Sequence, residues 1–174
     1  GPDFFDGRHT IGWWWWEVET FPERWMGSFD VVDEVWAGSR FVAETLSRIS
    51  PVPVVYVPMP VELPEGIAAD RPGLGRPEGF IFLFSFDYHS VFARKNPLGV
   101  VEAFRTAFPE PLPDGPILVI KSINGESHPV ARERLAGAVA GRPDIILRED
   151  YLDVREKNAL MASCDCYVSL HRSE

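Results

Sequence analysis

The chain has 174 residues, of which 45% are apolar, so it can bury a hydrophobic core in one large domain or in two small ones. Its 17 basic and 26 acidic side chains leave a formal net charge of -9, which disfavours binding to nucleic acid. No apolar run approaches the roughly 18 residues that a membrane-spanning helix needs.

The first third of the chain alternates between β-prone and helical segments. Residues 10–19 (TIGWWWWEVE) predict a buried aromatic strand, and Pro22 is suited to open a short helix. Residues 33–39 (DEVWAGS) predict a second strand, and Ser39 can cap the helix that follows. Residues 52–61 (VPVVYVPMPV) predict a third strand. This order is typical of a parallel sheet with crossover helices, as in a Rossmann-like domain.

The composition changes between Glu62 and Glu78, where the sequence ELPEGIAADRPGLGRPE is rich in proline and glycine and has no apolar period. Such a stretch indicates a linker. We therefore predict one domain in residues 1–62, a linker in 63–78 and a second domain in 79–174. The two glycines at 73 and 75 follow no strand and do not complete a dinucleotide-binding fingerprint.

The second part repeats the alternation of strand and helix with clearer signals. Asp153 and Glu156 are spaced as a capping box, and the apolar run before Lys121 is continuous, as in a parallel strand covered on both faces. The predicted strands are 80–86, 116–124, 144–150 and one that begins at 166, and the predicted helices are 97–108, 127–140 and 154–164. The expected fold class is α/β, with Rossmann-like parallel sheets and flanking helices.

The segment IFLFSFDYHSVFARKNPLGVVEAF passes from an apolar strand through a basic loop into a helix. Arg94 and Lys95 come immediately before Asn96, which suits an N-cap, and Pro97, which suits the first helical position. Two cations beside the positive end of a helix dipole favour a diphosphate, and a nucleotide-sugar is the expected ligand. The alternative is a solvated Arg-Lys pair on a surface loop.

Polar side chains follow each predicted strand of the second part. His89, Lys121, Tyr151 and His171 stand at or just after four different strand ends, and Glu174 ends the chain. Ligands of open parallel sheets bind beyond the carboxyl ends of the strands, so these side chains can share one rim. Lys121 directly follows four apolar residues, which favours a position in an anion-binding cleft over one in open solvent.

Cys164 and Cys166 are the only cysteines, and they lie one residue apart. This spacing does not favour a disulfide, and buried thiols in a reducing compartment are the expectation. The four histidines are scattered, so no metal site is predicted. We expect a cytoplasmic location, with the inner face of the membrane as an alternative for the full-length protein.

The chain resembles glycosyltransferases of the GT-B fold, family 4 in the sugar-nucleotide classification. The resemblance is carried by DEVWAGSRFVAETL with VPVVYVPMPV, by FSFDYHSVFARKNPLGVVEAF, by LVIKSINGE and by YLDVREKNALMASCDCYVSLHRSE, which together span most of the chain. Enzymes of this family consist of two Rossmann-like domains that face a cleft. The resemblance implies that residues 1–62 are the C-terminal part of the acceptor-side domain and that residues 79–174 bind the nucleotide-sugar.

The resemblance also assigns roles to single residues. Lys95, together with Arg94, is expected to contact the donor diphosphate, and Tyr151 and Leu152 match the loop that lies against the base. Glu174 matches the first of two glutamates separated by seven residues, the one that contacts the transferred sugar and is taken as catalytic. The second glutamate is absent from this chain.

One feature of the family pattern is missing near the first donor-domain strand. Many relatives carry an arginine there, whereas this chain has Phe86 and Asp87. His89 and Lys121 are the candidates that compensate for it, and His171 is expected to join them in the donor site. A GT-B enzyme is also about twice as long, so the chain resembles an interior fragment, incomplete at both ends.

For the complete enzyme, the resemblance implies transfer of a sugar from a nucleoside diphosphate sugar to a saccharide or lipid-linked acceptor, with retention and without a required cofactor or metal ion. Charge stabilisation of the departing diphosphate would supply most of the catalysis. Two alternatives remain open. The chain can be an inert folded module that forms a homodimer through exposed core surface, or part of a sugar-nucleotide epimerase that needs no acceptor.

Overall fold

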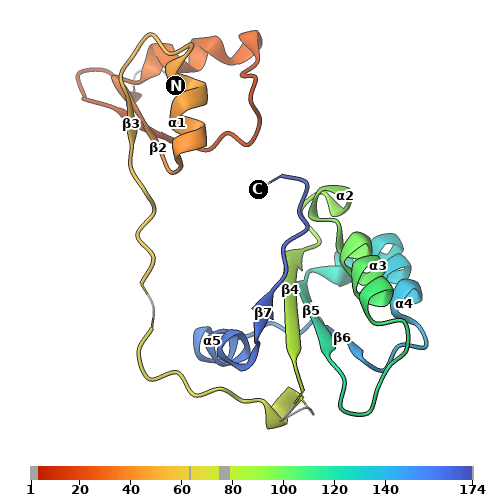
Figure 1. Ribbon diagram of the computed structural model, residues 1–174. Helices are drawn as coiled ribbons and strands as arrows, with labels where there is room; N and C mark the ends of the chain where they lie inside the picture. Colours follow the sequence, from red (N-terminus) through yellow and green to blue (C-terminus); the bar gives the residue numbers. More distant parts are fainter. Residues whose placement is uncertain (1–3, 63, 75–78, 174) are drawn as a thin grey trace. The chain divides into compact units, whose positions relative to one another are not determined.

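The structure is a computed structural model that describes residues 4–62, 64–74 and 79–173. The chain divides into two compact units, Gly1–Leu63 and Pro64–Glu174, and each unit has its own sheet (Figure 1). Every strand pair in both sheets is parallel, and helices flank the sheets. The predicted α/β class with parallel sheets is therefore confirmed.

The first unit holds a three-stranded sheet in the order β1-β2-β3. Its elements are β1 (Ile11–Trp14), the 3₁₀ segment η2 (Glu23–Val31), β2 (Glu34–Ala37), α1 (Arg40–Ser47) and β3 (Val54–Tyr56). Val35 and Ala37 of β2 are fully buried against Phe29 of η2 and Leu46 of α1. The predicted cap is present, because Ser39 Oγ accepts a hydrogen bond from the first turn of α1 at 3.2 Å.

The second unit holds a four-stranded sheet in the order β6-β5-β4-β7. Its elements are η3 (Pro72–Leu74), β4 (Ile81–Asp87), α2 (Phe92–Lys95), α3 (Pro97–Ala107), β5 (Ile117–Ile123), η4 (Gly125–Ser127), α4 (Pro129–Val139), β6 (Ile145–Arg148), α5 (Val154–Ser163) and β7 (Cys166–Tyr167). After β6 the chain crosses back and places β7 on the other side of β4. The order of the strands thus reverses between β4 and β7, and ligands of open α/β sheets bind at such a point.

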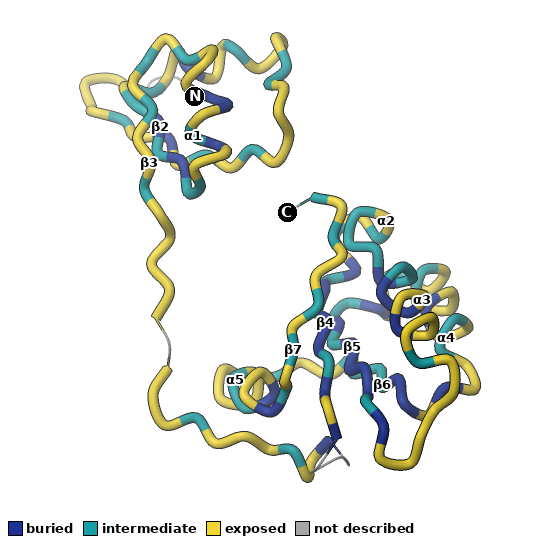
Figure 2. The backbone as a smooth tube through the Cα atoms, in the orientation of Figure 1, coloured by how far each residue is buried: buried dark blue, intermediate teal, exposed yellow. Residues whose placement is uncertain are grey.

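Figure 2 shows that β4 and β5 are buried along most of their length. Their side chains alternate between two apolar faces of the sheet. Phe84 and Ile120 belong to the core on the side of α3 and α4, whereas Leu83 and Val119 belong to the core on the side of α5. Neighbouring strand residues point to opposite faces, so the helices on both sides are held by the same two strands. The buried strands fix the position of the loops at their ends.

The structure differs from the prediction in the hydrogen bond that the Asn96 side chain makes. A short helix, α2, precedes this residue, and Asn96 ends that helix and starts α3 with φ 54°, a left-handed conformation that asparagine tolerates better than most residues. Its side chain makes no cap hydrogen bond to α3; instead Nδ2 donates to the Leu170 carbonyl at 3.1 Å. Asn96 thus holds the predicted N-cap position and Pro97 the first position of α3, but the side chain of Asn96 ties the basic loop to the segment after β7 and does not cap the helix.

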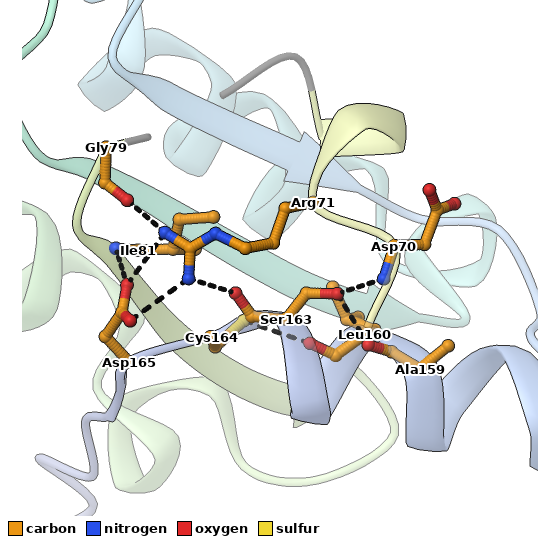
Figure 3. A network of polar contacts seen from close by, with 9 residues as sticks. All are labelled: Asp70, Arg71, Gly79, Ile81, Ala159, Leu160, Ser163, Cys164 and Asp165. Atoms are coloured by element: carbon orange, nitrogen blue, oxygen red, sulfur yellow. Dashed lines mark hydrogen bonds and ion pairs between the residues drawn. The ribbon is translucent and has the colours of Figure 1, made fainter. Parts of the chain in front are cut away.

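Part of the predicted linker packs on the second unit through Arg71 (Figure 3). The Arg71 guanidinium lies 3.0 Å from an Asp165 carboxylate oxygen, and it also donates to the carbonyls of Ser163 and Gly79. Asp165 accepts a further hydrogen bond from the Ile81 amide at 2.8 Å. This network lies where β4 and β7 begin, so it fastens residues 70–74 at the end of the sheet away from the strand exits.

Candidate functional site

A cavity of about 440 Å³ opens at the carboxyl ends of β4 and β5, on the side of the sheet that α5 covers. Its volume lies within the range of small-molecule pockets, about 300–1,000 Å³. Its wall is largely apolar, and its polar side chains come from β4, β5, β7, α5 and the loop after β6. The lining side chains are Leu83, Ser85, Phe86, Asp87, Lys121, Ser122, Ile123, Tyr151, Leu152, Lys157, Leu160, Met161 and Tyr167.

Lys121 supplies a positive charge to this cavity from within β5, two residues before the strand ends. Its Nζ donates to the carbonyls of Ser122 at 2.8 Å and of Asp150 at 2.5 Å, so the ammonium group is held beside the loop that follows β6. Burial lowers the pKa of Lys121, and the Asp150 carboxylate nearby opposes this effect. A half-buried cation in an apolar wall is a suitable partner for an anionic ligand.

Tyr151 and Leu152 border the same cavity from the loop after β6. Leu152 packs against the apolar cluster beneath α5, whereas the Tyr151 ring is largely exposed. On the opposite wall, Ser85 Oγ and Tyr167 Oη lie 2.9 Å apart and join β4 to β7. Three of the predicted donor-site residues, Lys121, Tyr151 and Leu152, are therefore brought together around one cavity.

A second polar group gathers around α2 and the segment after β7. Arg94 Nη1 donates to the Ser173 carbonyl at 3.1 Å, and the Arg172 amide donates to the Arg94 carbonyl at 2.8 Å. Lys95 follows in the last turn of α2, and the His171 ring packs edge-on against Phe84 with 5.2 Å between ring centroids. Figure 1 shows α2 and this final segment side by side beyond the end of β4.

His89 lies in the loop after β4, and its ring contacts a residue that the sequence analysis did not single out. His89 Nδ1 lies 3.0 Å from His128 Nε2, so at least one of these nitrogens carries no proton. The His89 amide donates to Asp87 at 2.9 Å. Of the predicted donor-site residues that the structure describes, Arg94, Lys95, His89 and His171 do not line the 440 Å³ cavity.

Other residues of this site have only weak sequence signals. Asp87, Asn124 and Tyr151 form a hydrogen-bonded chain across three strand ends, in which the bond from Asn124 to Asp87 measures 2.7 Å. The position of Asn124 at the end of a predicted strand is the only signal for it. Tyr167 lies inside a strand and had no such signal. Glu174, the predicted catalytic residue, lies outside the described residues.

A larger cavity, of about 880 Å³, lies between residues 64–74 and the start of α5. Of the predicted site residues in the described ranges, Leu152 alone borders it, so it is the weaker candidate for a nucleotide. Within the described residues, no cluster of three or more His, Cys, Asp or Glu side chains is arranged to hold a metal ion. No helix in that part of the chain combines the length and the apolar character needed to cross a membrane.

No protein-family model and no curated protein sequence matches the chain. Solved structures do match it. An apo structure of OtsA is 8% identical with a TM-score of 0.63, over 86% of this chain and 42% of that one. An E. coli structure bound with UDP-2-fluoro glucose is 10% identical with a TM-score of 0.60, over 86% of this chain and 42% of that one. The pneumococcal O-GlcNAc transferase GtfA, in complex with UDP and GlcNAc, is 18% identical with a TM-score of 0.51, over 87% of this chain and 28% of that one.

Because these sequence identities are low, the matches establish the fold alone. It is a partial GT-B fold. The chain spans less than half the length of these structures, and its parallel sheets with flanking helices match a Rossmann-like part of GT-B glycosyltransferases. The expected structural resemblance to this class of enzymes is confirmed to that extent.

Proposed function

We propose that the second unit binds the donor of a glycosyltransferase that transfers a sugar from a nucleoside diphosphate sugar to a saccharide or lipid-linked acceptor. The observation that carries this proposal is the 440 Å³ cavity at the carboxyl ends of the strands, with Lys121 and Tyr151 in its wall. It lies next to β7, where the strand order reverses. A nucleoside would occupy the apolar part of the cavity, and Tyr151 and Leu152 would face its base.

The cations of the strand exits fit the diphosphate of such a donor. Lys121 lies in the cavity wall. Lys95 lies outside that wall, at the end of α2 and next to the N-terminus of the eleven-residue helix α3, so the diphosphate would extend from the cavity toward α3. Helix N-termini and fixed cations both stabilise phosphate groups. As the bond to the sugar breaks, negative charge grows on the departing diphosphate, and these groups would offset that charge. The reaction would proceed with retention, and Glu174 would contact the transferred sugar.

Calorimetric titration of the chain with UDP, GDP and ADP tests the proposal. We expect one of the three to bind, and we expect Lys95→Ala and Lys121→Ala each to weaken its binding by about tenfold or more, or about 1.4 kcal/mol. Arg155→Ala is the matched control, because Arg155 is an exposed cation on α5 that does not line the cavity. Arg155→Ala should bind the nucleotide as the unmodified chain does.

Two results would contradict the proposal: no nucleoside diphosphate binds, or both lysine variants bind as tightly as the unmodified chain. A labelled nucleotide-sugar then separates the chemical alternatives in the full-length protein. Transfer to an added acceptor is the expected product, isomerisation of the donor indicates an epimerase, and an unchanged donor indicates a module without catalytic activity.

A further inference from the structure

Asn124 connects the ends of three strands of the second unit. It follows β5, and its Nδ2 donates to Asp87 Oδ1 at the end of β4 at 2.7 Å. Its Oδ1 accepts a hydrogen bond from the Tyr151 hydroxyl, which belongs to the loop after β6. Asp87 and Tyr151 both line the 440 Å³ cavity, whereas Asn124 itself does not. One amide group thus links two wall residues that no strand pairing connects.

We propose that Asn124 is a positioning residue for the donor site, which fixes Tyr151 and Asp87 in the cavity wall and thereby sets the geometry that a nucleotide meets. The inference deepens the proposed function and rests on it, since the nucleotide is the ligand of that site. Tyr151 is largely exposed and its loop holds no regular secondary structure, so this hydrogen bond supplies a restraint that packing does not. A binding group that is already held in place loses less entropy when its ligand binds.

The chemistry of the position requires an amide. Asp87 Oδ1 accepts one hydrogen bond from the His89 amide and one from the side chain at position 124. The residue at position 124 therefore has to be a donor toward Asp87. Tyr151 donates its hydroxyl proton, so the same residue also has to accept. An asparagine side chain does both, an ionised aspartate can only accept, and a leucine of similar shape can do neither.

The backbone of Asn124 favours asparagine as well. Its φ of 64° is left-handed, a conformation in which asparagine and aspartate are enriched and branched residues are strained. The hydrogen bond from Asn124 is the largest cause that lowers the pKa of the Asp87 carboxyl. Asp87 is therefore ionised at neutral pH and remains an acceptor.

Asn124→Asp gives the sharpest test, because protonation converts it into a mimic of the native residue. When the new carboxyl group and that of Asp87 are both ionised they repel, and the side-chain hydrogen bond between positions 87 and 124 is lost. As the pH falls, the two carboxyl groups at positions 87 and 124 together bind one proton. The pKa of this first protonation is raised because the two negative charges repel each other. A protonated carboxyl group at position 124 again donates to Asp87 and accepts from Tyr151. Nucleotide binding by this variant should recover between about pH 8 and about pH 5.

Two matched variants complete the design. Asn124→Leu removes both hydrogen bonds and should bind weakly at every pH. Asn158→Asp makes the same substitution on α5, at a residue that does not line the 440 Å³ cavity, and should bind as the unmodified chain does. His89 and His128 face Asp87 in every variant, so each affinity is expressed relative to the unmodified chain at the same pH.

The measurements are calorimetric affinity for UDP, GDP and ADP, and hydrogen exchange without ligand. We expect Asn124→Asp to weaken binding about tenfold at pH 8 and less than about threefold at pH 5. Exchange should rise at pH 8 in residues 149–152 and stay unchanged in β4 and β5. A general loss of stability would not produce this pattern, because it would raise exchange in the strands too.

Two outcomes overturn the inference: Asn124→Asp and Asn124→Leu bind as the unmodified chain does, or all variants lose affinity together with protection of the strands. If the unmodified chain binds no nucleoside diphosphate, the proposed function fails separately. Hydrogen exchange in residues 149–152 of Asn124→Asp then tests the positioning role without a ligand. Faster exchange that reverses at low pH supports this role, and unchanged exchange refutes it.

Discussion

The position of Lys121 in a buried strand changes the pKa of its side chain. The strands around it are buried, its ammonium group is held by two backbone carbonyls, and burial is the largest cause of its lowered pKa. A protonated amine in such surroundings is stabilised by an anion more than an exposed one would be. The pKa of Lys121 should therefore rise when a diphosphate binds.

Affinity for a nucleoside diphosphate should consequently depend on pH through Lys121. Below its lowered pKa the lysine is protonated in both the free and the bound protein, so this group does not make affinity depend on pH. As the pH rises through that pKa, which lies below the ordinary 10.5, the free protein loses the proton and affinity should fall. Titration calorimetry in two buffers of different ionisation enthalpy should detect proton uptake on binding in that pH range.

Lys121→Arg is the control for this pH dependence, because a guanidinium stays protonated across the whole range. Its affinity should not fall at alkaline pH and its binding should take up no proton from this position. Equal pH dependence in the two proteins would mean that Lys121 does not contact the nucleotide.

At the scale of elements, the start of α5 is fixed by its own first turn. The helix starts at a complete capping box, in which Asp153 accepts from the Glu156 amide at 2.8 Å and Glu156 accepts from the Asp153 amide at 2.9 Å. Its inner face contributes Lys157, Leu160 and Met161 to the cavity wall. The cap therefore determines where the wall of the site begins.

Removal of the cap should destabilise the second unit without touching the site directly. We expect Asp153→Ala to lower the free energy of unfolding by about 1 kcal/mol, the usual effect of losing an N-cap. Urea unfolding followed by circular dichroism measures the change. Asp114→Ala, in the exposed loop before β5, is the matched control and should unfold like the unmodified chain; equal destabilisation in both would argue against the capping role.

Local patterns predicted the elements that depend on local chemistry. The caps at Ser39 and Asp153 and the apolar runs of β4 and β5 follow from residue type and spacing, and the structure contains them. Asn96 holds the predicted N-cap position, but its side chain does not cap α3 because it bonds to Leu170, a contact 74 residues away that no local pattern indicates. The same limit applies to the site, since the link between Asn124 and Tyr151 depends on which strands become neighbours.

At the scale of the whole molecule, the sheet of the first unit has two unequal faces. Phe29 of η2 and Leu46 of α1 both pack on the face that carries Val35. On the other face, Trp36 of β2 pairs with Trp13 of β1 and with Val55 of β3. Trp13 and Trp15 are stacked, and they are 47% and 55% exposed. Among the described residues of this unit, no helix packs over that second face. Parallel sheets are usually covered on both sides, so this face favours association.

We expect the chain to self-associate through this aromatic face, as the predicted homodimer would. Trp13→Ser combined with Trp15→Ser should shift the association equilibrium toward monomer by about tenfold or more, because burial of two indole rings stabilises the contact. Sedimentation equilibrium over a range of concentrations measures the shift. Phe41→Ser is the control, since Phe41 is half exposed on α1; association that persists in the tryptophan variant would exclude this face.

The tryptophan-rich strand has a consequence for how folding of this chain can be observed. All six tryptophans precede residue 63, whereas Tyr88, Tyr151 and Tyr167 lie in the second unit. Indole emission therefore reports on one unit alone, and far-ultraviolet dichroism sums over both. When the two signals change at different denaturant concentrations, the units melt independently, and a single unlabelled sample resolves the two transitions.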